Sequence, residues 1–346
     1  MTLDAGFVAR VDARLSAVMG AERARWSAVD AALEPLLAEA ERLVASGGKR
    51  LRPRFCRWGW IAAGGDPGAV EPERIGAALE LLHVGALLHD DVIDAAETRR
   101  GASAAHRTFA AEHARAGWAG ETRRFGEGAA VLLGDIVFVM ADGCLGSTTD
   151  EVRQLWHEMR LEVNVGQYLD LLGGARRERD PSSTRRICRY KSAKYTVERP
   201  LQLGAAAAGA TDELLGVLSG YGVPLGEAFQ MRDDVLGAFG DEIATGKPVG
   251  GDFVEGKPTP MLALAWQAAD DVQRRVLHSV GDPDLSASAV ADIRRVVVET
   301  GALAETERLI ASLRDEAVAA LDDPHVHDGV RVALVALADE VTIRRT

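Results

Sequence analysis

The spacing of apolar residues is the feature of this sequence that most constrains its fold. Apolar side chains recur every three or four positions in most segments, for example over residues 29–43, 75–87 and 303–321. This spacing is typical of amphipathic helices, and the alternation typical of strands is nearly absent apart from residues 294–298. The sequence therefore predicts an all-α protein of roughly a dozen helices.

Short glycine-rich or polar stretches predict the breaks between these helices. They lie at residues 64–68, 117–128, 173–184, 240–257 and 281–286. None is long or biased enough to be a linker between domains. Because 346 residues with 47% apolar content can bury one large core, we predict a single domain over residues 1–346.

Charge and composition exclude several classes of protein. A net charge of -12 would repel a nucleic-acid backbone, so we expect no nucleic-acid partner. The three cysteines, Cys56, Cys144 and Cys188, are widely spaced and suggest neither a disulfide framework nor a zinc site. The N-terminus lacks a signal-peptide pattern, and we expect no run of the roughly 18 apolar residues that a membrane span needs. We expect a cytoplasmic protein without a transmembrane segment.

The first of two acidic clusters contains Asp90, Asp91 and Asp94, at the end of an apolar, helix-like stretch. On a helix, Asp90 and Asp94 share one face a turn apart, and Asp91 is turned away by roughly 100°. Magnesium takes few protein carboxylates and completes its shell with water and phosphate oxygens, so this pair suits a metal bridged to a phosphorylated ligand. The alternative is a solvated acidic helix end.

The helix face below these carboxylates is apolar, because it continues back through Ala86, His83 and Leu82. A metal at the rim of an apolar cavity implies an amphiphilic substrate. His83 could instead be an ordinary core histidine. The second acidic cluster, Asp233 and Asp234, ends a similar stretch, and residues 87–93 resemble residues 230–236. Two such helices could face each other across the cavity, although short matches of this kind also arise by chance.

Basic residues surround both acidic clusters. Residues 47–53 contain two glycines followed by Lys49, Arg50 and Arg52, and Arg99 and Arg100 follow the first cluster. Such groups suit a second diphosphate that binds without metal, although each stretch alone could be a basic surface turn. The chain has only five lysines, and four of them fall inside these motifs: Lys49, Lys191, Lys247 and Lys257.

The order of these motifs resembles that of the all-trans isoprenyl diphosphate synthases, or polyprenyl synthetases. The matching segments are Gly-Gly-Lys-Arg-x-Arg-Pro from residue 47, Asp-Asp-x-x-Asp from residue 90, Lys191-Ser192, Phe-Gln-x-x-Asp-Asp from residue 229, and Asp-x-x-Glu-Gly-Lys from residue 252. The resemblance covers the chain from about residue 33 onward. It implies a helical bundle around a central apolar cavity, the isoprenoid synthase fold, and a homodimer.

The resemblance also implies roles for individual residues. Asp90, Asp94 and Asp233 would bind up to three Mg²⁺ ions per site, and Asp91, Asp234 and Lys191 would join them in the catalytic set. Isopentenyl diphosphate would be bound by Lys49, Arg52, His83 and Arg100. The allylic diphosphate (dimethylallyl, geranyl or farnesyl) would be bound by Arg99, Lys191, Ser192, Gln230, Lys247 and Lys257.

Two positions depart from the family pattern. The second acidic motif usually ends in a third aspartate, but Gly237 occupies that position here, and Asp241 or water could substitute. We therefore expect weaker magnesium affinity but retained activity. Ser192 replaces the usual threonine and retains its hydroxyl.

The implied reaction is a head-to-tail prenyl transfer. Magnesium and basic groups neutralise charge on the departing diphosphate, and the resulting allylic cation is attacked by the double bond of isopentenyl diphosphate. Gly85 and Ala86 are small and leave the upper cavity open. Leu82, about 12 Å below Asp90 along the helix, or Leu79 beyond it, is the candidate floor of the cavity. We therefore expect geranylgeranyl diphosphate as the main product, with farnesyl or longer chains as competitors.

Three alternatives stay open at this stage. A class I terpene cyclase shares the helical fold, but its second metal motif usually begins with Asn-Asp, and the only asparagine is Asn164. A head-to-head squalene or phytoene synthase would not need the basic residues 47–53. A noncatalytic regulatory subunit of a prenyl diphosphate synthase tends to lose one acidic motif, and the missing aspartate at Gly237 keeps this alternative open.

Overall fold

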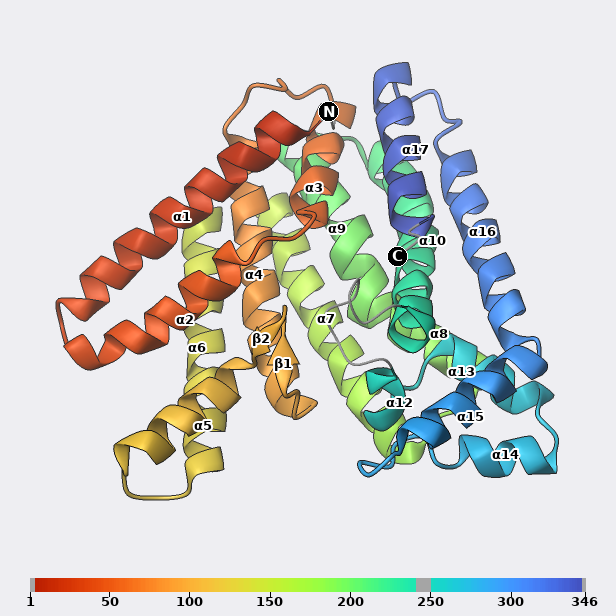
Figure 1. Ribbon diagram of the computed structural model, residues 1–346. Helices are drawn as coiled ribbons and strands as arrows, with labels where there is room; N and C mark the ends of the chain where they lie inside the picture. Colours follow the sequence, from red (N-terminus) through yellow and green to blue (C-terminus); the bar gives the residue numbers. More distant parts are fainter. Residues whose placement is uncertain (1–3, 241–249, 344–346) are drawn as a thin grey trace.

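The computed structural model describes residues 4–240 and 250–343, and in these residues it is almost entirely helical (Figure 1). The long helices are α1 (Ala5–Ser27), α4 (Glu71–Ile93), α6 (Thr122–Leu145), α7 (Asp150–Arg176), α10 (Asp212–Phe239), α16 (Ala302–Ala320) and α17 (Asp328–Thr342). The shorter ones are η1 (Ala31–Leu33), α2 (Glu34–Ala45), α3 (Leu51–Ala62), α5 (Ala105–Ala116), α8 (Pro181–Cys188), η2 (Arg189–Glu198), α9 (Arg199–Ala207), α12 (Gly251–Val254), α13 (Pro260–Ala268), α14 (Asp271–Leu277) and α15 (Ala287–Glu299). The prediction of an all-α protein is confirmed.

One two-stranded hairpin interrupts the helical pattern of the described residues. It pairs β1 (Thr98–Arg99) with β2 (Ala102–Ser103) in antiparallel register, directly after the first acidic cluster. Sequence periodicity did not predict it, because two residues per strand are too few to show alternation. Its turn residue Arg100 has φ 53°, so the arginine sits in the left-handed region.

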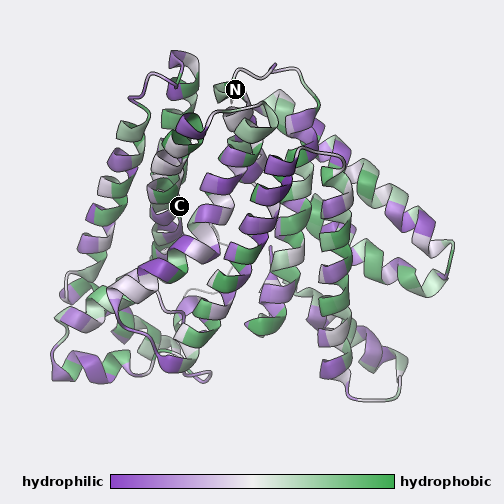
Figure 2. Ribbon diagram, turned by 180° about the vertical axis from the view of Figure 1, so that it is seen from behind, coloured by the Kyte–Doolittle hydropathy of each residue, from purple (hydrophilic) through white to green (hydrophobic). Residues whose placement is uncertain are grey.

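Helices α4, α7, α9 and α10 form the centre of the bundle (Figure 1). The α1–α2 hairpin and α6 flank α4 on one side, while α16 and α17 flank α10 on the other. Most helices carry polar residues on one side and apolar residues on the other, as Figure 2 shows. Their apolar faces form three clusters, one around α1, α4 and α6, one between α3, α9, α10 and α17, and one around α13, α15 and α16.

Local sequence signals fix where the two site-bearing helices α7 and α10 begin. The side chain of Thr149 accepts a hydrogen bond from the backbone N–H of Val152, and Thr211 does the same for Leu214. Both helices also carry two acidic residues in the first turn, where they interact favourably with the helix dipole. The starts of α7 and α10 are therefore set by capping threonines.

Two of the predicted breaks between helices are partly wrong. Helix α6 already begins at Thr122, so the break expected at residues 117–128 ends earlier than predicted. Helix α7 continues to Arg176, so the break expected at residues 173–184 begins later than predicted. Residues 294–298, the one alternating stretch, lie within helix α15. Part of the predicted break at 240–257 lies outside the described residues.

Helix α6 also corrects the membrane argument. By length and composition it is apolar enough to cross a bilayer, contrary to the expectation that no segment would be. Its inner face nevertheless packs on α4 and α5, and Leu133 and Val137 are fully buried there. A single helix of this kind passes the same test when it is a core helix, so it does not indicate a transmembrane segment.

Candidate active site

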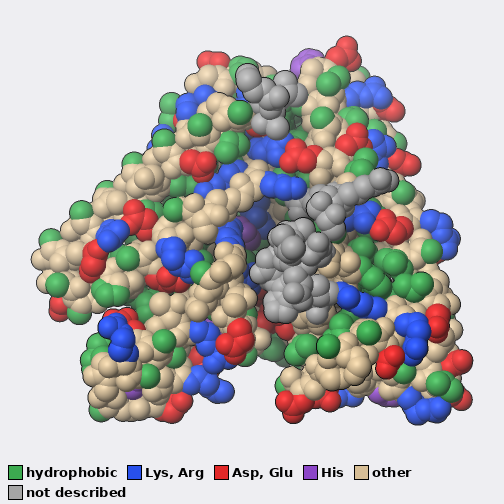
Figure 3. Space-filling view, viewed as in Figure 1, with side chains coloured by type: hydrophobic (Ala, Val, Ile, Leu, Met, Phe, Trp, Pro, Cys, Tyr) green, Lys and Arg blue, Asp and Glu red, His purple; other side chains and the backbone are tan. Residues whose placement is uncertain are grey.

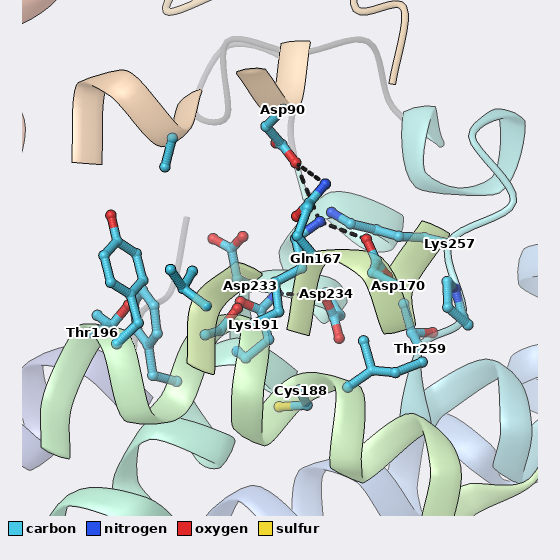
Figure 4. Close-up of a pocket in the computed structure, with 18 of the residues that line it drawn as sticks. Asp90, Gln167, Asp170, Cys188, Lys191, Thr196, Asp233, Asp234, Lys257 and Thr259 are labelled. Carbon is cyan, nitrogen blue, oxygen red and sulfur yellow. Dashed lines mark hydrogen bonds and ion pairs between the residues drawn. The ribbon is translucent and has the colours of Figure 1, made fainter. Parts of the chain in front are cut away.

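A cavity of about 290 Å³ opens between α4, α7, η2 and α10, and both acidic clusters reach it. Asp90 comes from the end of α4, while Asp233 and Asp234 come from α10. In Figure 4 Asp90 lies at the top of the view, and Asp233 and Asp234 lie below it. Lys and Arg side chains gather beside a hollow near the centre of the face shown in Figure 3. The structure thus brings two carboxylate clusters and basic groups to one place.

The three aspartates of the first cluster lie in different electrostatic environments. Burial raises the pKa of Asp90, but Lys191, Arg99 and Lys257 outweigh that effect and hold it below its usual value. Burial and the neighbouring Asp90 raise the pKa of Asp94 to about 7. A cation between these two carboxylates would lower the pKa of Asp94, so the pair fits a bound metal ion.

Asp91 is directed away from this pair and is bound by Arg99. The carboxylate accepts hydrogen bonds from Nε of Arg99, at 2.7 Å, and from Nη2. Both side chains are largely buried, and burial raises the pKa of Asp91. Arg99 also lies 3.6 Å from Asp90 and lines the cavity. Asp91 therefore holds Arg99 in place at the rim.

The second cluster is arranged around a buried carboxyl group. Burial raises the pKa of Asp234 to about 7, and its Oδ1 accepts a hydrogen bond from Nε2 of Gln230 at 2.8 Å. Asp233 lines the cavity beside it. Nearby, Lys257 lies 3.4 Å from Asp252, which is the main reason its pKa is raised well above the usual value. Lys257 is therefore a fixed cation at this end of the cavity.

The carboxylate of Asp252 lies beside Gly237. A Cβ atom at this position would overlap the carboxylate of Asp252, which comes from α12. This carboxylate is the end of a flexible side chain, and it reaches the space where the side chain of a third aspartate would begin. The sequence suggested Asp241 or water as the substitute for the missing carboxylate, and this stays a prediction. Asp241 and Lys247 lie outside the described residues.

Lys191 lies on the π-helical segment η2, between two carboxylates. Its Nζ is 2.5 Å from Asp170 and 3.3 Å from Asp90, and these charges raise its pKa although burial alone would lower it. The segment approaches α7 and α10 closely because Gly166 and Gly226 have no side chain there: a Cβ on either would overlap the backbone of η2. Ser192 lines the cavity next to it.

Two residues of α7 were missed by the sequence reasoning, Gln167 and Asp170. Gln167 donates a hydrogen bond to Asp90 at 2.9 Å, and Asp170 pairs with Lys191 (Figure 4). A usable signal did exist. Gly166, Asp170 and Gly173 follow one another at helical spacing, which places a carboxylate on the buried face of α7.

Two of the four residues predicted to bind isopentenyl diphosphate line the cavity, Arg52 from α3 and His83 from α4. The Nη2 atom of Arg52 donates a hydrogen bond to Oγ1 of Thr196 at 3.0 Å. Nδ1 of His83 lies 3.0 Å from the hydroxyl of Tyr195, and the guanidinium of Arg52 stacks 4.3 Å from the Tyr195 ring. Burial, together with Arg52 and Arg100, lowers the pKa of His83 well below its usual value.

Other predicted residues of this subsite lie beyond the lining of the cavity. Lys49 is exposed on the loop before α3, and Arg100 donates hydrogen bonds to Leu43 and Ser46 at the end of α2. Tyr195 was not predicted, because its contact with Arg52 and His83 depends on how η2 packs against α3 and α4. A tyrosine in a helical segment otherwise looks like an ordinary core residue.

The predicted chain-length residues do not share one environment. Ala86 and Leu87 line the cavity together with Val163, Ile187 and Phe229. Gly85 instead faces α6, since a Cβ there would lie 2.7 Å from the ring of Phe138. Gly85 therefore does not open the cavity, contrary to the expectation. Leu82 is buried and is not part of the described lining.

The similarity of this chain to known proteins agrees with the geometry of the site. Residues 34–298 match the family model "Polyprenyl synthetase". The chain belongs to the polyprenyl synthetase family. It is 31% identical to a short chain isoprenyl diphosphate synthase of Methanothermobacter thermautotrophicus, over 80% of this chain and 82% of that one. It is also 31% identical to a geranylgeranyl diphosphate synthase of Mycobacterium tuberculosis, over 93% of each chain.

A solved structure of this polyprenyl synthetase family is very similar along its full length. The geranylgeranyl pyrophosphate synthase of Corynebacterium glutamicum, complexed with isoprenyl diphosphate and magnesium, superposes with a TM-score of 0.94 at 35% identity, covering 100% of both chains. This confirms the isoprenoid synthase fold. Family membership also makes the protein a prenyltransferase that elongates prenyl diphosphates head to tail.

Proposed function

We propose that this protein condenses isopentenyl diphosphate with an allylic diphosphate in a magnesium-dependent reaction, and that its main product is geranylgeranyl diphosphate. The observation that carries the proposal is the cavity itself. It joins two facing carboxylate clusters, a set of fixed cations and an apolar wall. A substrate with a diphosphate head and a prenyl tail matches all three.

The allylic diphosphate would be bound at the carboxylate end of the cavity. Asp90, Asp94 and Asp233 would hold magnesium, which supplies positive charge to the departing diphosphate when bound. Lys191, Lys257 and Arg99 are fixed by carboxylate partners and are therefore positioned to stabilise the same developing charge. The carbon–oxygen bond of the allylic diphosphate then breaks, with both electrons leaving on the diphosphate.

Isopentenyl diphosphate would be bound by Lys49, Arg52, His83 and Arg100. Its double bond attacks the allylic cation, and a proton is lost to the released diphosphate, so the product is one isoprene unit longer. The apolar wall formed by Ala86, Leu87 and Phe229 excludes water that would otherwise quench the cation. The chain's own residues bind, orient and exclude water; none has to act as a nucleophile.

The Asp252 carboxylate is expected to support magnesium binding in place of the missing third aspartate. Replacing Asp252 with asparagine should raise the magnesium concentration for half-maximal activity by roughly tenfold, as expected for loss of an outer-shell partner. The magnesium-induced rise in melting temperature with inorganic pyrophosphate should weaken in parallel. Asp271→Asn, which changes an exposed carboxylate on α14, serves as the control. An unchanged magnesium titration in Asp252→Asn would show that Asp252 does not take the place of the missing third aspartate.

Product length is expected to depend on Ala86. Because this residue lines the cavity four positions before Asp90, an aromatic ring there would fill the path of the growing tail. Ala86→Phe should shift the main product to a chain at least one isoprene unit shorter, measured by chromatography of the dephosphorylated products. An unchanged product distribution would show that the floor of the cavity lies elsewhere.

We also propose a homodimer in the cytoplasm. Large apolar side chains are exposed along the outer faces of α6 and α7, among them Leu132, Val139, Leu161 and Val165. An apolar groove of about 920 Å³ runs between α6 and the α1–α2 hairpin. Such continuous apolar surface supports burial against a second copy.

The free cysteines Cys56, Cys144 and Cys188 support the proposed cytoplasmic location, because free thiols fit a reducing compartment.

A single assay tests the proposed function against its alternatives. Purified protein is incubated alone with magnesium, isopentenyl diphosphate and each allylic starter, and products are separated after dephosphorylation. The proposal predicts consumption of isopentenyl diphosphate and a twenty-carbon alcohol as the main product. A cyclic hydrocarbon without isopentenyl diphosphate would indicate a terpene cyclase, and no turnover would indicate a noncatalytic subunit.

A further inference from the structure

Arg50 differs from the other cations of the loop before α3, because its side chain points into the protein. Only 4% of the side chain is exposed, and its backbone lies in the left-handed region at φ 47° and ψ 45°. A residue other than glycine holds this conformation only where its surroundings compensate for the strain. The compensation at Arg50 comes from three contacts of its guanidinium group.

These contacts connect three other helices to the start of α3. Nη1 of Arg50 donates to Glu80 of α4 at 2.7 Å, Nε donates to Asp12 of α1 at 2.8 Å, and Nη2 donates to the carbonyl of Val44 in α2 at 2.9 Å. The Arg50–Glu80 pair is buried on both sides. The negative charges of Glu80 and Asp12 oppose the positive charge that Arg50 brings to the neighbouring subsite.

The position of this pair relates it to the proposed isopentenyl diphosphate residues. Lys49 precedes Arg50 directly, and Arg52 follows two residues later. His83 lies three residues after Glu80, about one turn along α4. On its other side, the loop is held by Arg100, which donates to Leu43 and Ser46 at 3.0 and 2.9 Å. The loop is thus fixed at both ends by guanidinium groups.

We propose that Arg50, held by Glu80, is a positioning residue for the isopentenyl diphosphate subsite. It fixes the loop over residues 46–50 and so sets the places of Lys49 and Arg52 relative to His83. This inference rests on the proposed function, because it assumes that these cations bind isopentenyl diphosphate. The allylic subsite around Asp90 and Lys191 does not contact the pair directly and should be unaffected.

Two variants test this role, Glu80→Gln and Arg50→Lys. We expect each to raise KM for isopentenyl diphosphate about tenfold, the effect of displacing one hydrogen bond to a charged group, while KM for the allylic diphosphate stays within about twofold. Glu80→Gln separates positioning from charge. It adds one positive charge to the subsite, so an electrostatic role alone predicts tighter binding, whereas a positioning role predicts weaker binding.

Arg54→Lys is the matched control, because Arg54 is another buried arginine, within α3, and pairs with Asp4 and Glu340 away from the site. It should lower the melting temperature without separating the two KM values. Calorimetric binding of isopentenyl diphosphate to the folded variants gives a second readout. Equal changes in both KM values, or an unchanged or lower KM for isopentenyl diphosphate in Glu80→Gln, would overturn the inference. Wild-type protein that fails to consume isopentenyl diphosphate would instead contradict the proposed function on which it rests.

Discussion

Replacing Asp90 with asparagine is expected to lower kcat/KM for the allylic diphosphate by about a thousandfold, the scale of losing a metal ligand that stabilises charge in the transition state. The carboxylate of Asp90 lies opposite Asp233 and Asp234 and contacts both Gln167 and Lys191. Asparagine keeps the shape of the side chain but removes its negative charge. The rate of product formation at saturating magnesium measures the effect.

Asp271→Asn is the control for this prediction. Asp271 lies on α14 with 93% of its side chain exposed, outside the cavity. The same chemical change there should leave kcat/KM within about twofold, as for most exposed substitutions. Circular dichroism should show that both variants remain folded. Near-normal turnover in Asp90→Asn would mean that the first acidic cluster does not hold the metal.

The largest loss of stability is expected from Gly204→Ala. A Cβ on Gly204 in α9 would overlap the carbonyl of Cys56 in α3, and Gly59 meets the carbonyl of Leu201 in the same way across the contact. Backbone atoms cannot move aside as a flexible side chain can, so the two helices must separate. We expect a loss of about 3 kcal/mol in the free energy of unfolding, the upper end for overpacking a core. Thermal unfolding followed by circular dichroism measures it.

Gly216→Ala provides the matched control for this change. Gly216 lies within α10, and a Cβ there would meet open space. Because alanine favours a helix interior over glycine, this substitution should raise stability by roughly 0.5 to 1 kcal/mol. Equal melting temperatures for the two variants would show that α3 and α9 can separate at little cost, and that the close crossing does not determine stability.

Much of the fold and part of the site could be predicted because they depend on local patterns. Helical spacing predicted the all-α class, and the four-residue separation of Asp90 and Asp94 placed both on one face. The direction of Asp91 also follows from helical geometry, and the structure shows that Arg99 binds it. These features require only the period of the helix and the charge of the side chain.

The remaining features depend on contacts between distant segments. Gly85 and Ala86 are adjacent, but only Phe138 of α6 determines that Gly85 is covered while Ala86 reaches the cavity. Similarly, Asp252 occupies the space beside Gly237 because α12 folds against α10. The inward direction of Arg50 depends on Glu80 and Asp12, which are far away in the sequence. No pattern within a single helix contains this information.

The most direct test of the central claim is a crystal structure of the protein with magnesium and a thiolated analogue of the allylic starter, whose diphosphate leaves too slowly to react. We predict that both phosphorus atoms lie between the Asp90–Asp94 pair and Asp233, with magnesium contacting carboxylates from both clusters and the prenyl tail passing Ala86. Phosphorus atoms bound away from both carboxylate clusters would contradict the account.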